Sequence, residues 1–283
     1  MLLFETYRRV CFVFHAGSNG GRPHRHRIFK IAIGEKILME VHHITLSIVI
    51  PFYNEEESIR GVCDEVRQAL SGIHDLTWEL VMVDDGSTDL TPQIMDELAG
   101  KFVNFRSLHL SPNSGQSAAL EAGFGSAKGE FIATLDGDGQ NDPHDIPGLL
   151  KEMKKNGLDM LCGIRQRRAD NLIRRVSSRI ANRIRSAVLK DNVTDIGCSM
   201  RIFRRACTKR IRFFRNAHRF FPALFIMAGY TVAEIPVNHR PREHGTSKYG
   251  GGINSRLLPG IIDLAGVYWL RKRSLRYTIM EKT

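Results

Sequence analysis

The amino-acid sequence predicts an α/β fold in which a mostly parallel central sheet is covered by helices. From residue 44 onward, short runs rich in β-branched residues alternate with longer stretches of helical periodicity, which is typical of parallel sheets covered on both faces. With 283 residues, of which 42% are hydrophobic, the chain is long enough to bury one sizeable core. Polar clusters follow several of the predicted strands, where sheets of this kind bind their ligands.

The predicted strands and helices alternate along the first half of the chain. Each strand is a short apolar run bounded by turn residues, and each helix repeats its apolar residues at a spacing of three or four. The predicted strands are Leu46–Pro51, Glu79–Asp84, Phe105–Leu110 and Phe131–Asp136. The predicted helices are Glu56–Ser71, Leu90–Ala99, Gly115–Ala127 and Asp145–Lys155. The alternation is that of a nucleotide-binding α/β domain, with its ligand crevice beyond the carboxyl ends of the strands.

The second half of the chain is strongly basic. Between Arg165 and Arg215 there are 16 Lys or Arg residues against three acids, and the whole chain carries a net charge of +11. A helix over Leu172–Leu189 and a strand over Tyr230–Val237 are predicted here. The charge favours polyanionic partners, which could be nucleic acid, anionic lipid headgroups or phosphorylated substrates.

The two ends of the chain differ from the domain between them. Residues 1–43 lack sustained periodicity, so we expect a disordered N-terminal extension, either dispensable or the product of an upstream start. The folded domain is expected over 44–250 and a C-terminal tail over 251–283. The tail contains Leu257–Leu270, which is interrupted by Pro259, Gly260 and Asp263 and ends in a basic cluster. This pattern predicts amphipathic helices at a membrane interface rather than a membrane span.

Nothing in the sequence indicates secretion. The five cysteines are far apart and form no Cys-x-x-Cys pair, so neither a disulfide framework nor a structural zinc site is predicted. No run reaches the roughly 18 to 20 apolar residues of a membrane span. The start of the chain lacks the features of a signal peptide. We therefore expect a reducing compartment.

An acidic segment follows the predicted strand at Phe131–Asp136. Its side chains at Asp136 and Asp138 can point the same way as the chain leaves the strand, and Gln140 continues the alternation with a neutral oxygen. Mg²⁺ and Mn²⁺ prefer such hard oxygen ligands and usually keep phosphates and waters in their shell. An acidic surface turn could have the same Asp-Gly-Asp-Gly sequence. The position of the segment after a predicted strand is what favours a metal site.

Four blocks of the sequence resemble, in order, those of family 2 glycosyltransferases. The blocks are SIVIPFYNEE at Ser47–Glu56, VDDGSTD at Val83–Asp89, DGDGQNDP at Asp136–Pro143 and REHGTSKY at Arg242–Tyr249. The closest similarity is to the branch of dolichyl-phosphate mannose synthases and bacterial polyprenyl-phosphate glycosyltransferases, over about residues 45 to 250. The resemblance implies a GT-A fold, which is a Rossmann-like sheet with flanking helices, and a metal-dependent transfer from a nucleotide sugar.

By position, the resemblance assigns the donor site. Asp85 would bind the base or ribose, and Asp84 would support its turn. The implied nucleotide-sugar residues are Pro51, Tyr53, Glu55, Asp84, Asp85, Asp136, Gly137, Asp138, Arg242 and Lys248. The implied metal ligands are Asp136, Asp138 and Gln140, with Mg²⁺ or Mn²⁺ as the cofactor. Many relatives have Ala where this chain has Gly137, a departure that leaves the carboxylates intact and should not impair function.

The resemblance also assigns an acceptor site, whose residues would bind a lipid phosphate. They are Arg165, Arg174 and Ser178. A polyprenyl phosphate is anionic near neutral pH and can attack the anomeric carbon directly, so no strong base is needed and the centre inverts. The implied catalytic residues are Asp138, Asp195, Arg242 and Lys248. Of these, Asp195 would orient the acceptor, while Arg242 and Lys248 would close over the donor diphosphate.

The expected activity is transfer from a GDP- or UDP-sugar to dolichyl or undecaprenyl phosphate, by a peripheral enzyme on the cytoplasmic face of a membrane. Leu257–Arg276 would contact the membrane surface or a separate, small membrane-spanning subunit. A sugar-to-sugar transferase of the same fold, acting in cell-envelope polysaccharide synthesis, is the alternative, although the Gln-x-x-Arg-Trp block of processive enzymes is absent. A catalytically silent scaffold is a further reading. A non-enzymatic nucleic-acid-binding protein is disfavoured, because acids at the crevice would repel a phosphate backbone.

Overall fold

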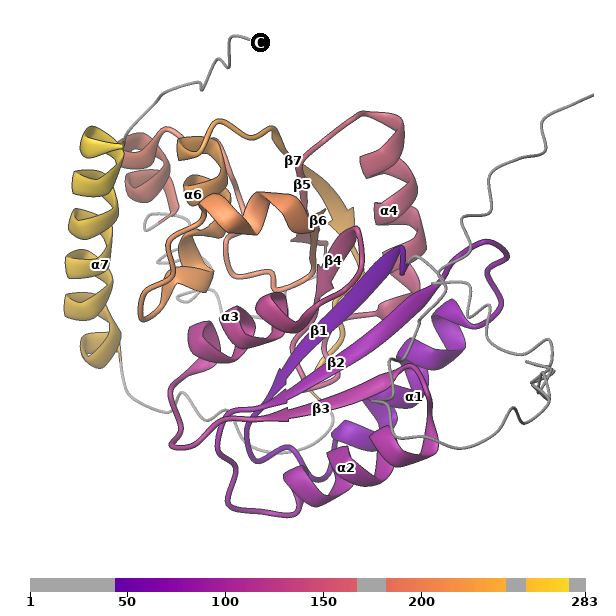
Figure 1. Ribbon diagram of the computed structural model, residues 1–283. Helices are drawn as coiled ribbons and strands as arrows, with labels where there is room; N and C mark the ends of the chain where they lie inside the picture. The colour runs from indigo at the N-terminus through magenta and orange to yellow at the C-terminus, as the bar shows by residue number, and fades with distance from the viewer. Residues whose placement is uncertain (1–43, 167–181, 243–252, 275–283) are drawn as a thin grey trace, which may run out of the picture. The chain divides into compact units, whose positions relative to one another are not determined.

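The central feature of the fold is a seven-stranded sheet in the order β3-β2-β1-β4-β6-β5-β7 (Figure 1). The computed structural model describes residues 44–166, 182–242 and 253–274. The strands are β1 Leu46–Phe52, β2 Trp78–Asp84, β3 Phe105–His109, β4 Phe131–Thr134, β5 Met160–Arg165, β6 Arg201–Arg204 and β7 Val232–Val237. The helices are α1 Ile59–Leu70, α2 Thr91–Lys101, α3 Gln116–Ser126, α4 Ile146–Lys155, α6 Phe221–Met227 and α7 Ile253–Arg273. Residues 182–189 are also helical, and short 3-10 turns lie at η1 Pro143–Asp145, η2 Arg205–Arg210 and η3 Ala217–Phe220.

Strand direction brings most of the strand ends to one edge of the sheet. Strand β1 is parallel to β2 and β4, β2 is parallel to β3, and β5 is parallel to β7. Strand β6 is antiparallel to both of its neighbours, β4 and β5. The carboxyl ends of the other six strands therefore share an edge with the amino end of β6. The prediction of a mostly parallel sheet is confirmed.

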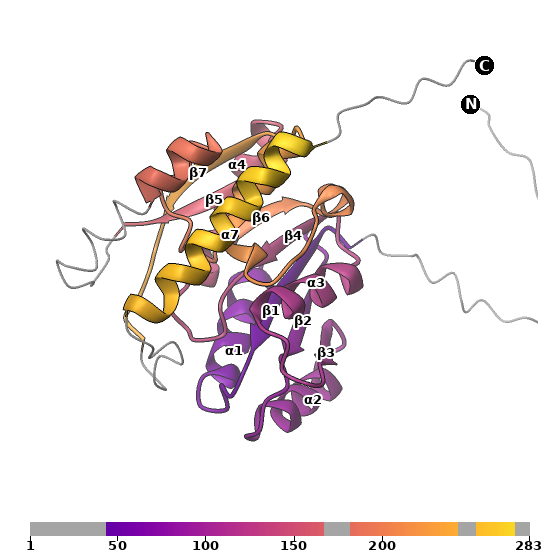
Figure 2. The same cartoon turned by 90° about the vertical axis from the view of Figure 1, so that its left-hand side faces the viewer.

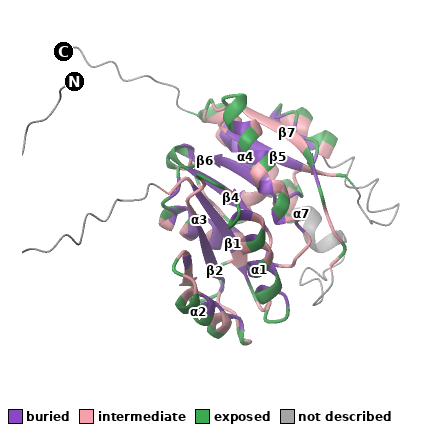
Figure 3. Cartoon of the chain, turned by 90° about the vertical axis from the view of Figure 1, so that its right-hand side faces the viewer, coloured by how far each residue is buried: buried purple, intermediate pink, exposed green. Residues whose placement is uncertain are grey.

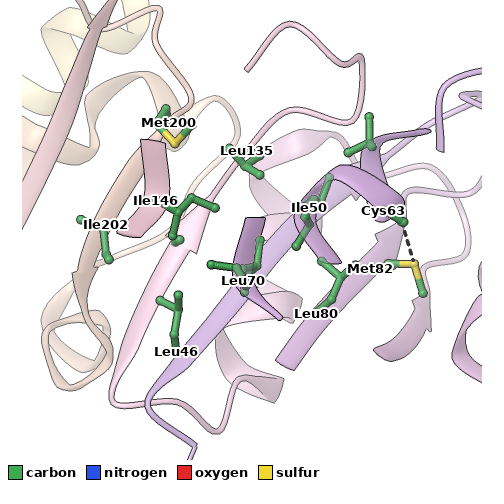
Figure 4. Close-up of a cluster of buried hydrophobic side chains, with 14 of the residues drawn as sticks. Leu46, Ile50, Cys63, Leu70, Leu80, Met82, Leu135, Ile146, Met200 and Ile202 are labelled. Carbon is green, nitrogen blue, oxygen red and sulfur yellow. Dashed lines mark hydrogen bonds between the residues drawn. The ribbon is translucent and has the colours of Figure 1, made fainter. Parts of the chain in front are cut away.

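Both faces of the sheet are buried, because alternate residues of the central strands enter opposite layers. Leu46, Ile48 and Ile50 of β1 pack with α1, α2 and α4, whereas Val49 packs with α3 and α6 on the other face. Figure 4 shows part of the first layer, where the Cys63 thiol lies 3.6 Å from the Met82 sulfur. Figure 3 shows buried strands beneath helices whose outer faces are exposed. Two-sided burial explains why the strands are nearly continuous apolar runs.

The predicted elements of the first half are confirmed to within a few residues, but β5, β6 and α6 were missed. Strand β6 has four residues with an arginine at each end, which hides the strand pattern. Arg201 is nevertheless buried, because its guanidinium donates to the carbonyls of Ile196 (2.8 Å) and His218 (2.7 Å) and lies over the Phe221 ring. Arginine that is fully hydrogen-bonded can occupy a buried strand in this way.

Helix α7 is longer than the interrupted stretch that the sequence suggested. It begins at Ile253 and continues past Pro259, which is exposed, so water can satisfy the carbonyl that the proline leaves without a donor. Val267 is buried in the core, and Arg271 donates to the Val188 carbonyl at 3.0 Å. Figure 2 shows α7 on the side of the molecule that also carries residues 182–189. In the described ranges, no helix combines the length and the apolar character required to cross a bilayer.

A buried carboxylate joins the sheet to α3 at the edge opposite the strand ends described above. Glu79 is 2% exposed and accepts hydrogen bonds from Ser47 Oγ and Lys128 N, both at 2.6 Å, and from Arg106 Nη1 at 3.0 Å. Three donors compensate for the loss of hydration of this charge. Removing the carboxylate would leave these donors, including a guanidinium, without their acceptor.

We expect Glu79→Ala to lower the free energy of unfolding by about 3 kcal/mol in urea titrations at neutral pH. The control is Glu97→Ala, since Glu97 pairs with Arg60 at 2.6 Å on the surface, where its side chain is 60% exposed. That change should cost less than about 1 kcal/mol. Equal losses in the two variants would show that Glu79 is not a structural centre.

Candidate functional site

The polar residues of the candidate site lie at the edge where the strand ends meet. Register places Phe52 beside Asp84, and Thr134 beside Arg201. The Asp85 amide also donates to the Phe52 carbonyl at 2.8 Å, which ties the ends of β1 and β2 together. Pro51 belongs to β1, and Tyr53 follows it with its side chain partly exposed. The three polar blocks after β1, β2 and β4 thus lie at one edge of the sheet.

The two aspartates that follow β2 have different surroundings. The Asp84 carboxylate accepts from the Ser87 amide at 2.9 Å, within the turn. The Asp85 carboxylate reaches across to the loop before α3 and accepts from the amides of Ser114 (2.8 Å) and Gly115 (3.0 Å). Burial raises the pKa of Asp85 above its usual value, and those two amides act in the opposite direction. Asp85 therefore fixes one wall of the crevice as well as being a candidate ligand of the nucleotide.

The acidic segment after β4 is held by neutral hydrogen bonds. Gln116 at the start of α3 donates its side-chain amide to Asp136 Oδ1 at 2.8 Å, and the Asp136 backbone amide donates to Asn141 Oδ1 at 3.1 Å. Asp138 Oδ1 accepts from the Gln140 amide at 3.1 Å, which makes a tight turn. The two carboxylates and the Gln140 side chain therefore come from a single turn at the end of β4.

Charge is concentrated at this turn. Burial, and secondarily repulsion from Asp138, raise the pKa of Asp136 to about 6. Hydrogen bonds from Ser199 and Gln116 and the positive charge of Arg201 lower it only in part. A bound cation would offset this cost, since it favours the ionised form of both carboxylates.

Gly137 lies between the two aspartates and packs against the end of β1. A β-carbon at this position would lie 2.5 Å from Phe52 Cδ1 and 3.0 Å from the Pro51 carbonyl. The Gly137 carbonyl in turn accepts from Ser58 Oγ at 2.8 Å. The acidic turn therefore packs closely against the end of β1. The Phe52 side chain limits the space available for a side chain at Gly137.

The segment that follows β7 and leads to Arg242 runs along the acidic segment. The Arg240 amide donates to the Gln140 carbonyl at 2.8 Å, and the Gln140 side-chain amide donates back to the Arg240 carbonyl at 3.2 Å. The Arg240 guanidinium contacts both Glu65 (2.8 Å) and Asp142 (2.9 Å). These contacts bring Arg242 to Glu55, where its Nη2 donates to Oε1 at 2.7 Å. Glu55 and Arg242, 187 residues apart, are thus paired beside the acidic turn.

On the other side of the site, Arg165 and Asp195 form a two-pronged ion pair. Arg165 ends β5, and its Nε and Nη2 donate to the two oxygens of Asp195 at 2.8 and 2.7 Å. The side chains are 15% and 6% exposed, which favours a well-defined geometry. A cavity of about 440 Å³ opens at Gln166, the residue that follows Arg165. It is lined by Asp142, Gln166, Asn238, His239 and Arg240.

Comparison with known proteins shows which family the chain belongs to. The model of glycosyl transferase family 2 matches residues 47–212. This chain belongs to glycosyltransferase family 2. It is 38% identical over 240 residues to a dodecaprenyl-phosphate galacturonate synthase of Rhizobium johnstonii, covering 83% of this chain and 70% of the relative. It is also 38% identical over 206 residues to an undecaprenyl-phosphate 4-deoxy-4-formamido-L-arabinose transferase of Pseudomonas fluorescens. This match covers 72% of this chain and 60% of the relative.

The fold of this family 2 glycosyltransferase is the GT-A fold that its sequence implied. Its structure is similar to that of glucosyl-3-phosphoglycerate synthase from Mycobacterium tuberculosis in complex with Mn²⁺, UDP and phosphoglyceric acid, with a TM-score of 0.60 and 18% identity over 78% of each chain. A second structure of that protein contains Mg²⁺ and UDP, at the same TM-score. Divalent cations thus accompany the nucleotide in that enzyme.

The residues of this glycosyltransferase fit a divalent cation. The turn supplies hard oxygen atoms from Asp136, Asp138 and Gln140, which is the donor chemistry of Mg²⁺ and Mn²⁺. Among the described residues, no group of three or more His, Cys, Asp or Glu side chains could hold a metal. The arrangement suits a cation that shares its shell with the phosphates of a nucleotide rather than one enclosed by protein.

Some predicted site residues fall outside the described ranges. Arg174 and Ser178 lie in 167–181, and Lys248 lies in 243–252, so their roles remain predictions.

Cys198 is buried with its pKa raised to about 11, chiefly by burial, in agreement with a packing role.

Sequence reasoning missed several residues that support the site. They are Ser58, Gln116, Asn141, Ser199 and Arg240. Their roles depend on partners far along the chain, such as the 79 residues between Ser58 and Gly137. The position of Gln116 at the start of a helix after a predicted strand was the one available signal.

We expect Gly137→Ala in this glycosyltransferase to cost about 1 to 3 kcal/mol of stability and to reduce transferase activity, because the new methyl group would overlap the buried Phe52 ring. Phe52→Val removes the ring atoms that the methyl group meets but leaves a cavity in the core. The loss in the double variant should therefore be smaller than the sum of the two single losses. A double-mutant cycle in urea, with activity measured alongside, tests this coupling. Strict additivity of the two changes would contradict the packing described here.

Proposed function

We propose that this enzyme transfers a sugar from a nucleotide sugar to a polyprenyl phosphate, with inversion at the anomeric carbon. The observation that carries the proposal is the pairing of Asp195 with Arg165, in which both carboxylate oxygens accept from the guanidinium. A carboxylate engaged in this way is a poor general base, so Asp195 supports an acceptor that is already anionic. The similarity to two transferases named for polyprenyl phosphates supports the same acceptor class.

On the donor side, the acidic turn and Arg242 would share the diphosphate. A divalent cation held by Asp136, Asp138 and Gln140 would supply positive charge to the leaving diphosphate. Pro51, Tyr53, Glu55 and Asp85 would then line the nucleoside pocket. Arg242 would exchange its contact with Glu55 for a phosphate oxygen, a change that keeps the guanidinium in a charge-assisted hydrogen bond throughout.

On the acceptor side, Arg165 would bind the phosphate of the lipid while Asp195 fixes the plane of the guanidinium. Arg174 and Ser178 are proposed to complete this site, and Lys248 to join Arg242 at the diphosphate. The ionised phosphate oxygen attacks the anomeric carbon from the face opposite the leaving diphosphate, so no proton has to be removed. The work of the enzyme is then alignment and stabilisation of the leaving group.

The proposed lipid acceptor requires contact with a membrane, and α7 offers a surface for it. Ile261, Ile262, Tyr268 and Trp269 expose 54%, 62%, 41% and 59% of their area, next to Lys272 and Arg273 at the basic end of the helix. An exposed apolar face with aromatic side chains and basic residues suits the interface of an anionic bilayer. We propose a peripheral position on the cytoplasmic face of the membrane, with a small membrane-spanning subunit as the alternative partner of this face.

Incubating membranes that contain the enzyme with a panel of labelled GDP- and UDP-sugars tests the acceptor. We expect label in an acid-labile lipid fraction, lost in excess chelator. Asp138→Ala should reduce this labelling by about a hundredfold or more without unfolding the protein. Asp64→Ala is the control, because Asp64 is an exposed acid paired with Arg67 on α1. Label recovered only in water-soluble glycan would exclude the lipid acceptor and favour a sugar acceptor.

Sedimentation with lipid vesicles tests the membrane face. The purified enzyme should bind vesicles of phosphatidylcholine and phosphatidylglycerol, and the double variant Ile262→Ser, Trp269→Ser should bind about tenfold or more weakly. The control is Leu90→Ser, Val103→Ser, which removes two exposed apolar side chains near α2. If both double variants bind as the wild type does, α7 is not the membrane contact.

A further inference from the structure

A second carboxylate, Glu234, lies behind the Arg165–Asp195 pair and was not among the expected site residues. Glu234 is on β7, where it pairs with Cys162 of β5, the strand that ends at Arg165. Its side chain accepts from the amide of Thr194 at 2.9 Å, from Thr194 Oγ1 at 3.0 Å and from the amide of Asp195 at 3.1 Å. Glu234 therefore binds the backbone of Asp195, the residue whose carboxylate binds Arg165.

The segment that carries Asp195 has no regular structure of its own. It runs from the end of the helical residues 182–189 to β6, and Lys190 and Asn192 both have left-handed backbone conformations, with φ of 53°. Such a segment keeps one conformation only if side chains hold it. Within the described residues, several side chains from outside the segment do so. Glu234 binds Thr194 and Asp195, and Arg185 binds Asp191 and Val193. Asn182 and Arg201 donate to the carbonyls of Thr194 and Ile196.

Two of these side chains, Glu234 and Arg185, are electrostatically linked. Arg185 is 4% exposed, donates to the Asp191 carboxylate, and donates to the Val193 carbonyl at 2.6 Å. Burial lowers the pKa of Arg185, whereas Asp191 first and Glu234 after it raise it. The negative charge of Glu234 thus stabilises the buried Arg185 guanidinium, and its carboxylate also accepts hydrogen bonds from the Thr194 and Asp195 amides.

Little room exists for Arg165 to adopt another orientation. Its backbone amide donates to Asp195 Oδ2 at 3.1 Å, in addition to the two bonds from its guanidinium. The backbone of Gly197 lies so near that a β-carbon there would come within 2.6 Å of Arg165 Nη2. A displacement of the Thr194–Asp195 backbone would therefore move the Arg165 guanidinium with it.

We propose that Glu234 is a positioning residue for the acceptor phosphate, acting through the backbone of Thr194 and Asp195 on the direction of the Arg165 guanidinium. The inference rests on the proposed function, in which Arg165 binds that phosphate. Because Glu234 contacts neither the acidic turn nor the residues of the nucleoside pocket in the interactions described above, its removal affects the acceptor rather than the donor. A displaced guanidinium loses phosphate affinity, since the strength of its hydrogen bonds depends on angle.

The test compares the full-length wild type with Glu234→Ala and Glu234→Gln, using a short-chain polyprenyl phosphate as acceptor and the nucleotide sugar identified for the wild type. We expect Glu234→Ala to raise the KM for the acceptor about tenfold, with the KM for the donor and kcat changed by less than about threefold. Glu234→Gln, whose amide oxygen still accepts from the Thr194 and Asp195 amides, should recover most of the acceptor KM.

The matched control is Asp159→Ala. Asp159 makes the equivalent contact at the other end of β7, accepting from the amide and the hydroxyl of Thr231, both at 2.9 Å. This variant should lose similar thermal stability while keeping the acceptor KM of the wild type. In an Arg165→Lys background, Glu234→Ala should raise the acceptor KM less than about twofold further, because the positioned group is already changed.

The outcomes separate the two proposals. Failure of the wild type to glycosylate polyprenyl phosphate overturns the proposed function and the role of Glu234 together. If the wild type is active, the role of Glu234 alone is overturned by either of two results: an unchanged acceptor KM in both Glu234 variants, or an equal rise in Asp159→Ala.

Discussion

The site of this glycosyltransferase depends on two carboxylates, Asp136 and Asp138, that share one turn at the end of β4. Burial and mutual repulsion raise the pKa of Asp136 to about 6, so at neutral pH the turn carries charge that its neutral hydrogen-bond donors only partly stabilise. A divalent cation that accompanies a nucleotide diphosphate would offset this negative charge. The remaining polar residues at this edge of the sheet either hold the turn in place or present cations around it.

The supporting contacts divide the crevice into two sides. On the donor side, Ser58 joins Glu55 to the Gly137 carbonyl, and Glu55 in turn holds Arg242. On the proposed acceptor side, the Asp195 carboxylate binds the Arg165 guanidinium, and Glu234 holds the backbone of Asp195. Antiparallel β6 separates β4 from β5 and so sets the acidic turn and Arg165 on different strands at one edge. The strand order thus places the acidic turn and the Arg165–Asp195 pair, the proposed donor and acceptor sites, at the same edge of the sheet.

The sequence predicts where the residues of the proposed donor half lie, because they follow strands that are plain apolar runs and because Asp136 to Gln140 form one local turn. The acceptor half is harder to predict. Strand β6 is short and ends in arginines, and Asp195 meets Arg165 across 30 residues through a segment without periodicity. Glu234, on a correctly predicted strand, gave no signal of its own, since its partners lie about 40 residues away. Local pattern identifies residues that act from strand ends, whereas long-range hydrogen bonds appear only in the folded chain.

We propose that the turn at Asp136 to Gln140 binds the nucleotide diphosphate through a divalent cation. Crystals of the enzyme grown with Mn²⁺ and either UDP or GDP, examined by anomalous scattering at the manganese edge, test this binding. We expect one manganese peak in bonding contact with the Asp138 carboxylate and with phosphate oxygens of the nucleotide, and no such peak in Asp138→Ala. A nucleotide bound at this edge with manganese absent from the turn, or with manganese bound elsewhere, would contradict it.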